Sequence, residues 1–240
     1  MKFTNSFISG MKRGLPIALG YVPIAITFGL IAKSQGVPNY ISIMMSALVF
    51  AGASQFVAIN LLALGTGYLQ IVVTTFIVNL RHFLMTASIS QRIKGTVSQK
   101  WMPVLAFGIT DETFSFISLS PSEKLSSGFI FGINTIAYIA WVSGTALGTF
   151  LGKSLPEILQ TSMGISLYVM FIGLLVPSFK KSRSIVIISL LSAGISSLLY
   201  WGPSVLTSIP KGWKIIITTV LASAIGVLIF PEEKEVESVE

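Results

Sequence analysis

Apolar runs of about twenty residues, separated by short polar stretches, recur along the whole chain. A helix of roughly 20 apolar residues spans the hydrocarbon core of a membrane. The pattern predicts eight candidate segments, at residues 15–33, 40–64, 69–90, 103–120, 128–151, 161–179, 184–201 and 213–230. We therefore expect an all-α polytopic membrane protein with about six to eight membrane helices.

The polar stretches outside these segments are short. The longest are residues 91–102 and the acidic C-terminus, 231–240. The N-terminus is basic, and no small-residue cleavage pattern closes the apolar run behind it, so we interpret this run as a retained span and not as a signal peptide. The predicted organisation is a cytoplasmic N-terminal segment (1–14), a transmembrane transporter domain (15–230) and the acidic tail.

The distribution of Lys and Arg bears on how many segments cross the membrane, because cytoplasmic loops carry an excess of both. With a cytoplasmic N-terminus and eight full crossings, eight basic residues lie inside and seven outside, which is no bias. If one of the second and third segments, and also the fourth, returns to its own side, then Arg92, Lys94 and Lys100 move inside. The count becomes eleven against four. This favours six crossings with two broken or re-entrant segments, although counting leaves seven crossings open.

The second segment contains a candidate helix break. The stretch FAGASQF (50–56) places Gly52, Ala53 and Ser54 in the middle of a long apolar run. Gly and Ser pairs are common positions for a helix to kink or unwind. We expect the helix to be interrupted there.

The fourth segment is too polar for a helix that faces lipid. Its Thr110-Asp111-Glu112 has the form of a helix start, with a capping hydroxyl followed by acids in the first turn. A helix that begins at membrane depth is tolerated only against protein or a water-filled cavity. This segment is therefore predicted to be broken and enclosed.

Other segments carry packing signals. In the first, Pro16 lies where a helix can begin and Pro23 predicts a kink. Small residues at a spacing of four let membrane helices approach closely, and the fifth segment has such glycines: Gly128, Gly132, Gly144, Gly148 and Gly152. Segments one to three can also be laid over segments five to seven, which suits an inverted repeat with a site near the midplane.

Composition agrees with a membrane protein. Of the 240 residues, 52% are hydrophobic and 10% are charged, and the mean hydropathy is +0.82, whereas a soluble domain is about a quarter charged. The absence of cysteine excludes disulfides and thiolate metal sites. The net charge of +7 is spread between apolar runs and forms no patch, so we expect no nucleic-acid binding.

When the loops and the ends of the segments are set aside, only four Asp, Glu, Lys, Arg or His residues remain within the apolar segments: Arg81, His82, Asp111 and Glu112. A charge at the centre of the bilayer costs about 2.5–3.5 kcal/mol on insertion scales and is expected to face the protein interior in a pair. Arg81 could pair with Asp111 or Glu112, which would remove most of that cost. His82 has an ordinary pKa near neutrality and could take part in proton coupling.

Structural explanations remain open for the same residues. Arg81 could extend along the helix to the headgroups, and the two acids could merely cap a hydrated helix. A satisfied hydrogen bond would explain His82. The uncharged Ser54, Gln55 and Asn79 could contact a solute near the helix break, or could only bond neighbouring helices, which contributes about 0.6 kcal/mol on average.

Catalytic patterns are missing from the chain. There is no G-x-S-x-G elbow and no H-E-x-x-H, and a single histidine cannot assemble a histidine-rich metal site. There is also no P-loop to bind ATP. We expect neither an enzyme nor a bound cofactor.

Six motifs occur in order: GLPIALGYVPIAITFG (14–29), FAGASQF (50–56), NLRH (79–82), TDETF (110–114), INTIAYIAWVSGTALGTFLG (133–152) and FIGLLVP (171–177). Together they resemble the AzlC-type branched-chain amino acid permease family, over about residues 10–180. The resemblance implies an exporter of branched-chain amino acids, with methionine as a further candidate, that works with a small AzlD-type membrane subunit. The motifs carry over onto Gly52, Ser54, Gln55, Asn79, Arg81, His82, Asp111 and Glu112.

One position departs from the family pattern. Many relatives have a leucine-aspartate pair shortly before the FIGLLVP-like motif, where this chain has MGIS (163–166). If that aspartate couples transport to protons, Gly164 cannot replace it. Proton coupling by resemblance is therefore less secure than the family itself.

The residues and the resemblance lead to one hypothesis. The chain is predicted to be a multi-pass transporter of the cell membrane that exports branched-chain amino acids, driven by the proton gradient. Substrate binding is assigned to Gly52, Ser54, Gln55, Asn79 and Arg81, and proton coupling or gating to His82, Asp111 and Glu112. The alternatives are an uncoupled channel for a small solute and a scaffold subunit that does not itself transport.

Overall fold

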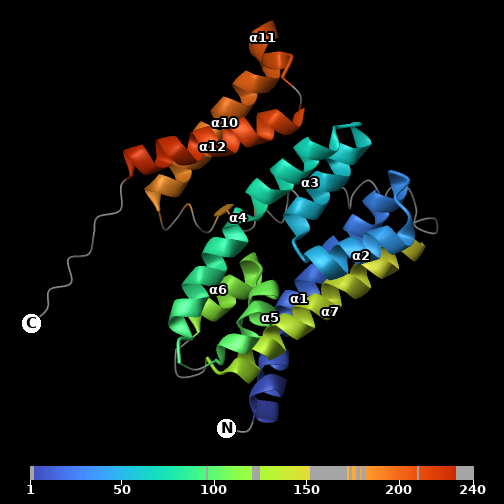
Figure 1. Ribbon diagram of the computed structural model, residues 1–240, viewed down its shortest axis with the longest axis vertical. Helices are drawn as coiled ribbons and strands as arrows, with labels where there is room; N and C mark the ends of the chain where they lie inside the picture. Colours follow the sequence, from blue (N-terminus) through green and yellow to red (C-terminus); the bar gives the residue numbers. More distant parts are fainter. Residues whose placement is uncertain are drawn as a thin grey trace, which may run out of the picture. The chain divides into compact units, whose positions relative to one another are not determined.

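The computed structural model describes residues 3–95, 97–120, 125–151, 182–209 and 211–230, together with residues 172, 175, 176 and 179. Every regular element in these residues is a helix (Figure 1), which confirms the all-α class. The chain divides into two units, the first holding Met1–Ala63 and Thr75–Tyr168 and the second Leu64–Thr74 and Val169–Glu240. Most of the predicted segment 161–179, on which the proposed repeat depends, lies outside the described residues, as do Gly152, Gly164 and the acidic tail.

Two long helices form the centre of the first unit. α1 (Phe3–Ser34) and α7 (Ser127–Leu151) lie side by side (Figure 1). About half of the membrane-length part of each is buried, 44% in α1 and 50% in α7, against 6% in α4 (Tyr68–Arg92). The buried core of the first unit therefore lies along the α1–α7 pair.

Glycines set the close approach of α1 and α7. A Cβ atom on Gly132 would stand 2.8 Å from the backbone nitrogen of Met11, and one on Gly148 would stand 3.0 Å from the Cα of Ile26. The predicted packing role of small residues at a spacing of four is thus confirmed. Because these contacts advance in the same direction along both helices, α1 and α7 run parallel.

The expected helix start at Pro16 is wrong. α1 begins at Phe3, and both Pro16 and Pro23 lie inside it. The residues before Pro16 continue the contact with α7, because Ser6 and Gly10 are buried two turns and one turn before Gly14. Tertiary packing thus stabilises helical turns that the proline signal alone would place outside the helix.

The second segment is broken into α2 (Asn39–Val49) and α3 (Gly52–Ala63). The break lies at Phe50–Ala51, just before the Gly52 to Ser54 stretch predicted to unwind, which instead begins α3. Phe50 ends α2 in the left-handed conformation, with φ 45°, a common way to end a helix although usually with glycine.

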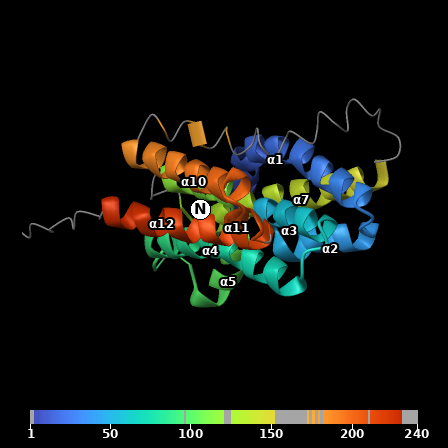
Figure 2. The ribbon, with the colours of Figure 1, turned by 90° about the horizontal axis from the view of Figure 1, so that it is seen from above.

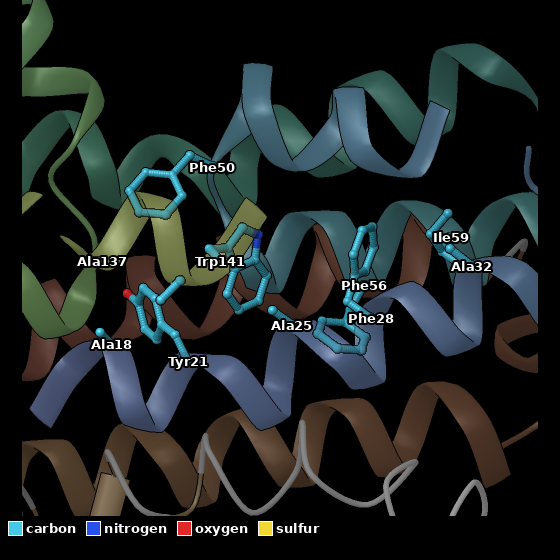
Figure 3. Packing of buried hydrophobic residues seen from close by; sticks show 11 residues of the cluster. Ala18, Tyr21, Ala25, Phe28, Ala32, Phe50, Phe56, Ile59, Ala137 and Trp141 are labelled. Atoms are coloured by element: carbon cyan, nitrogen blue, oxygen red, sulfur yellow. The ribbon is translucent and has the colours of Figure 1, made fainter. Parts of the chain in front are cut away.

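α2 and α3 form a re-entrant hairpin. Its course follows α1 from the C-terminal end to the middle and back (Figure 3), as three contacts show: Lys33 Nζ donates to Asn39 Oδ1 at 2.7 Å, the Phe50 ring lies 6.4 Å from the Tyr21 ring, and the Phe56 ring lies 5.4 Å from the Phe28 ring. The chain therefore returns to the end of the unit from which α2 started.

The fourth segment is a second hairpin. The short 3-10 helix η1 (Gln99–Trp101) leads into α5 (Met102–Phe107), and α6 (Asp111–Leu119) follows the break. Its course runs along α7 and back, as three contacts show: the Trp101 ring lies 5.9 Å from Phe131, the Phe107 ring lies 5.9 Å from Tyr138, and Arg92 Nη1 donates to the carbonyl of Ile117 at 3.1 Å.

The two hairpins enter the first unit from opposite ends and meet near Tyr21. Among the described residues between α1 and α7, α4 is the only helix long and apolar enough to cross a membrane. The parallel course of α1 and α7 agrees with the prediction that the second and fourth segments both return. The loop before α5 lies at the N-terminal end of α1, because Phe3 and Trp101 both pack on the Phe131 ring.

The second unit contains α10 (Arg183–Trp201), α11 (Ser204–Thr207) and α12 (Lys211–Ile229). α10 and α12 lie side by side (Figure 2). Among the described residues, four helices are long and apolar enough to cross a membrane, namely α1, α4, α7 and α10, and the apolar part of α12 is shorter. The chain is thus a multi-pass membrane protein.

Candidate functional site

The start of α6 is fixed by a reciprocal cap at the hairpin tip. The Thr110 backbone nitrogen donates to Thr113 Oγ1 at 2.8 Å, and the Thr113 backbone nitrogen donates to Thr110 Oγ1 at 3.4 Å. The predicted helix start is therefore confirmed. It places Asp111 and Glu112 in the first turn, where the helix dipole favours negative charge.

Arg81 of α4 forms an ion pair with Asp111. Arg81 Nη1 lies 3.0 Å from Asp111 Oδ2, and the two side chains are 31% and 26% exposed. This confirms the predicted pairing of Arg81 with an acid of the fourth segment. The pair is thus partly buried within the described residues.

Arg81 and Asn79 keep unused polar atoms. Arg81 Nε and Asn79 Oδ1 are buried, and neither has a hydrogen-bond partner among the described residues. A buried donor or acceptor without a partner costs about 1–3 kcal/mol. Binding a ligand at either atom would recover part of that cost.

His82 follows Arg81 on α4 and is half-buried. Its side chain is near enough to both Arg81 and Asp111 for their charges to act on it, and it bonds the backbone of Asn79. Both interpretations of His82, a hydrogen bond within the protein and a part in proton coupling, therefore stay open. A coupling role for His82 stays a prediction.

Glu112 has a different environment from Asp111. The hydroxyl of Tyr21, on α1, donates a hydrogen bond to Glu112 Oε2 and lies 2.6 Å from Thr110 Oγ1. Tyr21 is 4% exposed. The tip of the second hairpin is thus held against the middle of α1 by hydroxyl groups.

Gln55 is the centre of a separate, uncharged network at the first hairpin. Its Oε1 accepts from the indole nitrogen of Trp141 at 3.0 Å and from the backbone nitrogen of Ala51 at 3.3 Å, and its Nε2 donates to Ser46 Oγ at 3.0 Å. Ser46 in turn lies 2.7 Å from Thr145 Oγ1. Gln55 is 1% exposed, so both ends of its amide are bound within the protein.

The two smaller predicted residues of this hairpin also make internal contacts. Ser54 Oγ donates to the carbonyl of Ala51 at 2.9 Å. A Cβ atom on Gly52 would stand 2.8 Å from the Trp141 ring. Both residues therefore support the break itself, and their predicted contact with a solute stays a prediction.

Tyr21 and Trp141 join the two networks. Their rings meet edge to face with centroids 5.4 Å apart (Figure 3). Sequence reasoning missed both residues, because aromatic side chains in apolar runs look like core. The available signal was their position in two of the six motifs, within GLPIALGYVPIAITFG and INTIAYIAWVSGTALGTFLG.

Asn134 of α7 was missed as well. Its Nδ2 donates to the carbonyl of Leu105 at 3.1 Å, while its buried Oδ1 has no partner in the described part of the chain. The side chain lies directly against Gly108, where any Cβ atom would collide with it. Asn134 thus contacts the break between α5 and α6 from the side of α7.

Arg92 secures the other end of α6. Its Nη1 donates to the carbonyl of Ser118 at 2.7 Å and its Nη2 to that of Ser120 at 3.1 Å. A cation at the C-terminal carbonyls of a helix is favourable. α4 therefore holds α6 at its start through Arg81 and at its end through Arg92.

The arrangement can recognise a small zwitterion. Arg81 offers guanidinium donors that suit a carboxylate, Asp111 offers an acceptor that suits an ammonium group, and both lie at a helix break inside the unit. No group of three or more His, Asp or Glu side chains that could hold a metal ion is found among the described residues.

Comparisons with known proteins agree with the motif set. The family model described as AzlC protein matches residues 16–155. The inner membrane protein YgaZ of Escherichia coli (strain K12) is 30% identical over 199 residues, 80% of this chain and 81% of that protein. The branched-chain amino acid transport protein AzlC of Bacillus subtilis (strain 168) is 30% identical over 150 residues, 62% of this chain and 58% of that protein.

An archaeal relative is more similar over a shorter stretch. An uncharacterized membrane protein of Archaeoglobus fulgidus is 34% identical over 176 residues, 72% of this chain and 76% of that protein. No solved structure matches the chain. Residues 16–155, which the family model matches, include both hairpins and all the ionisable residues of the candidate site.

Proposed function

Because the chain belongs to the AzlC family, we propose that it transports branched-chain amino acids across the cell membrane and binds them at Arg81. The Bacillus subtilis relative, whose name gives that activity, supports the substrate class. The observation that carries the site is the ion pair between Arg81 and Asp111, 3.0 Å apart and partly exposed at a helix break.

Geometry and charge fit this class of substrate. Transporters commonly bind substrate near the midplane at broken helices, and here two hairpin tips meet beside the middle of α1. The substrate carboxylate competes with Asp111 for Arg81, while the ammonium group takes Asp111 as its acceptor. Arg81 Nε and Asn79 Oδ1, both without partners within the described residues, supply further polar contacts.

The finer parts of the function are proposals of the same kind. We place the N-terminus in the cytoplasm, so that Arg92, Lys94 and Lys100 lie on the cytoplasmic side. We assign the direction as export driven by protons. A small AzlD-type membrane subunit is the proposed partner. Gly52, Ser54 and Gln55 are proposed to contact the substrate from the first hairpin, with His82 and the acids in coupling or gating.

Arg81→Ala tests the site. Cells loaded with a leucine-containing dipeptide should lose leucine efflux when Arg81 is replaced, with the protein present in the membrane at normal amounts. A charge-assisted hydrogen bond contributes about 1.5–3 kcal/mol, which corresponds to about a 10- to 100-fold loss of affinity.

Lys33→Ala is the matched control, since it also removes one cation. Lys33 contacts Asn39 at the outer end of the first hairpin, so efflux should stay within about twofold of wild type. Normal efflux from Arg81→Ala would reject the site. Absence of leucine efflux from the wild-type protein together with its partner subunit would reject the substrate class.

A further inference from the structure

The two adjacent acids at the start of α6 have partners of different kinds. Asp111 faces a full positive charge, the guanidinium of Arg81 at 3.0 Å. Glu112 has no cation within ion-pair distance in the described part of the chain, and its carboxylate accepts from the neutral hydroxyl of Tyr21. Protonation would therefore remove an ion pair at Asp111 but only change a hydrogen bond at Glu112.

A proton on Asp111 would break an ion pair. Removing one charge of a pair inside a protein leaves the other without compensation, which is strongly unfavourable. A proton on Glu112 breaks no ion pair. On this ground Glu112 is the acid that can change its charge at membrane depth with the smaller structural consequence.

The hydroxyls around Glu112 can serve both of its protonation states. Tyr21 has one hydroxyl hydrogen, which it donates to the carboxylate, so Thr110 must donate its own hydrogen to Tyr21 across their 2.6 Å contact. When Glu112 carries a proton, each donor and acceptor exchanges role. Thr110 then donates to Thr113 Oγ1, 3.3 Å away, and no heavy atom has to move.

The ionisable groups around Glu112 come from three helices. α4 contributes the cation of Arg81, and α6 contributes Asp111, while His82 of α4 is near Arg81 and Asp111. From α1 only Tyr21 reaches the carboxyl group. The single ionisable residue of α7, Tyr138, donates instead to the carbonyl of Ala47 at 2.9 Å.

We propose that Glu112 takes up and releases the coupling proton, that Tyr21 positions it, and that the Arg81–Asp111 pair keeps its charges. The inference rests on the proposed transport function. In this step a hydronium ion at one membrane face gives its proton to Glu112 Oε2, and the acid later gives the proton to water at the other face. No electron is transferred.

Glu112→Gln tests the assignment, because glutamine keeps the size and polarity of the side chain and cannot change its charge. The purified protein is placed in liposomes. Leucine exchange is measured at equal pH, and uphill leucine accumulation is measured with an imposed pH gradient. We expect the variant to lose at least about tenfold more of the accumulation than of the exchange, and accumulation that falls no further than exchange would overturn the proposal.

Infrared titration keeps the assignment testable whatever the substrate. Nine acidic side chains give carbonyl bands when protonated, so the band of Glu112 is taken from the difference between the wild-type and Glu112→Gln spectra. A difference band that titrates with pH is expected, and Asp111→Asn should keep it. Identical titrations of wild type and Glu112→Gln would overturn the proposal even if leucine proves to be the substrate. A Glu112 band without leucine exchange in wild type would instead reject the proposed function alone.

Tyr21→Phe tests the positioning role, since phenylalanine keeps the ring contact with Trp141 and removes the hydroxyl. A hydrogen bond to a charged carboxylate is stronger than one to the neutral acid. Its loss should shift the pH of half-maximal driven transport upward by about one unit. A change in rate with an unchanged pH profile would mean that Tyr21 is only structural.

Discussion

The two re-entrant hairpins have similar shapes and different chemistry. At the α2–α3 break the polar groups are uncharged, and Gln55 and Trp141, 1% and 2% exposed, bond within the protein. At the α5–α6 break the residues are charged, and Arg81 and Asp111 are 31% and 26% exposed. A broken membrane helix is therefore not a binding site by itself. At the α2–α3 break the polar groups bond to one another. Beside the α5–α6 break, Arg81 Nε and Asn79 Oδ1 have no partner within the described residues.

The largest effect is expected from removing the charge of the second hairpin. Asp111→Asn leaves Arg81 without its anionic partner, at a cost of about 2.5–3.5 kcal/mol on insertion scales. Leucine efflux from cells should fall at least about tenfold at equal protein amount. Ser42→Ala in the first hairpin, at a position outside the proposed site, is the control and should change efflux less than about threefold, because it removes one internal bond worth about 0.6 kcal/mol.

If Asp111→Asn transported normally, the charged hairpin would be no more functional than the uncharged one. The comparison would then fail at its strongest point. A large loss in Ser42→Ala would contradict the comparison from the other side, because it would give the first hairpin a direct part in transport.

A smaller effect, on stability, is expected in the first hairpin. Gln55→Leu removes the partners of Trp141, Ser46 and the Ala51 backbone nitrogen, and each buried group left without a partner costs about 1–3 kcal/mol. The variant should unfold at a lower temperature in detergent. Its leucine affinity should change less than that of Arg81→Ala.

This variant also decides the substrate role proposed for Gln55. Gln55→Glu adds a second comparison, because glutamate keeps the size of the side chain and brings a charge to the uncharged break. If Gln55→Leu remained fully stable but lost affinity tenfold, the amide would be a substrate contact and the first hairpin a second half of the site.

The smallest effects are expected from two matched glycine variants. Gly52→Ala brings a Cβ atom to 2.8 Å from the Trp141 ring, and Gly108→Ala drives one into Asn134. Overpacking typically costs about 1–3 kcal/mol, so both variants should lose some stability. Gly108→Ala should lower the transport rate of the folded protein more than Gly52→Ala does, and equal transport rates in the two variants would show that Asn134 has no part in the site.

The sequence was sufficient where the signal is local. Thr110 followed by two acids predicted the start of α6, because a cap and the charges of a first turn lie within four residues. The pairing of Arg81 with Asp111 was also predictable, since few opposite charges are available in the apolar segments. The return of two segments was within reach of a Lys and Arg count.

The rest depends on contacts between distant segments. Phe50 ends α2 because it packs against Tyr21, 29 positions earlier, and no local signal announces a left-handed phenylalanine. The first turns of α1 form because they lie on α7, which outweighs the start signal at Pro16. Tyr21 and Trp141 acquire their polar roles only when Glu112 and Gln55 reach them.

The two arginines of α4 have a mechanical consequence. Arg81 and Arg92 are 11 positions apart, a rise of about 16 Å, and they lie on nearly the same side of the helix. They hold both ends of the nine-residue α6, a helix too short to persist alone in water. A sliding or turning motion of α4 must therefore either move α6 with it or break both the Arg81 and the Arg92 contacts. We expect α4 and α6 to move together as one rigid body.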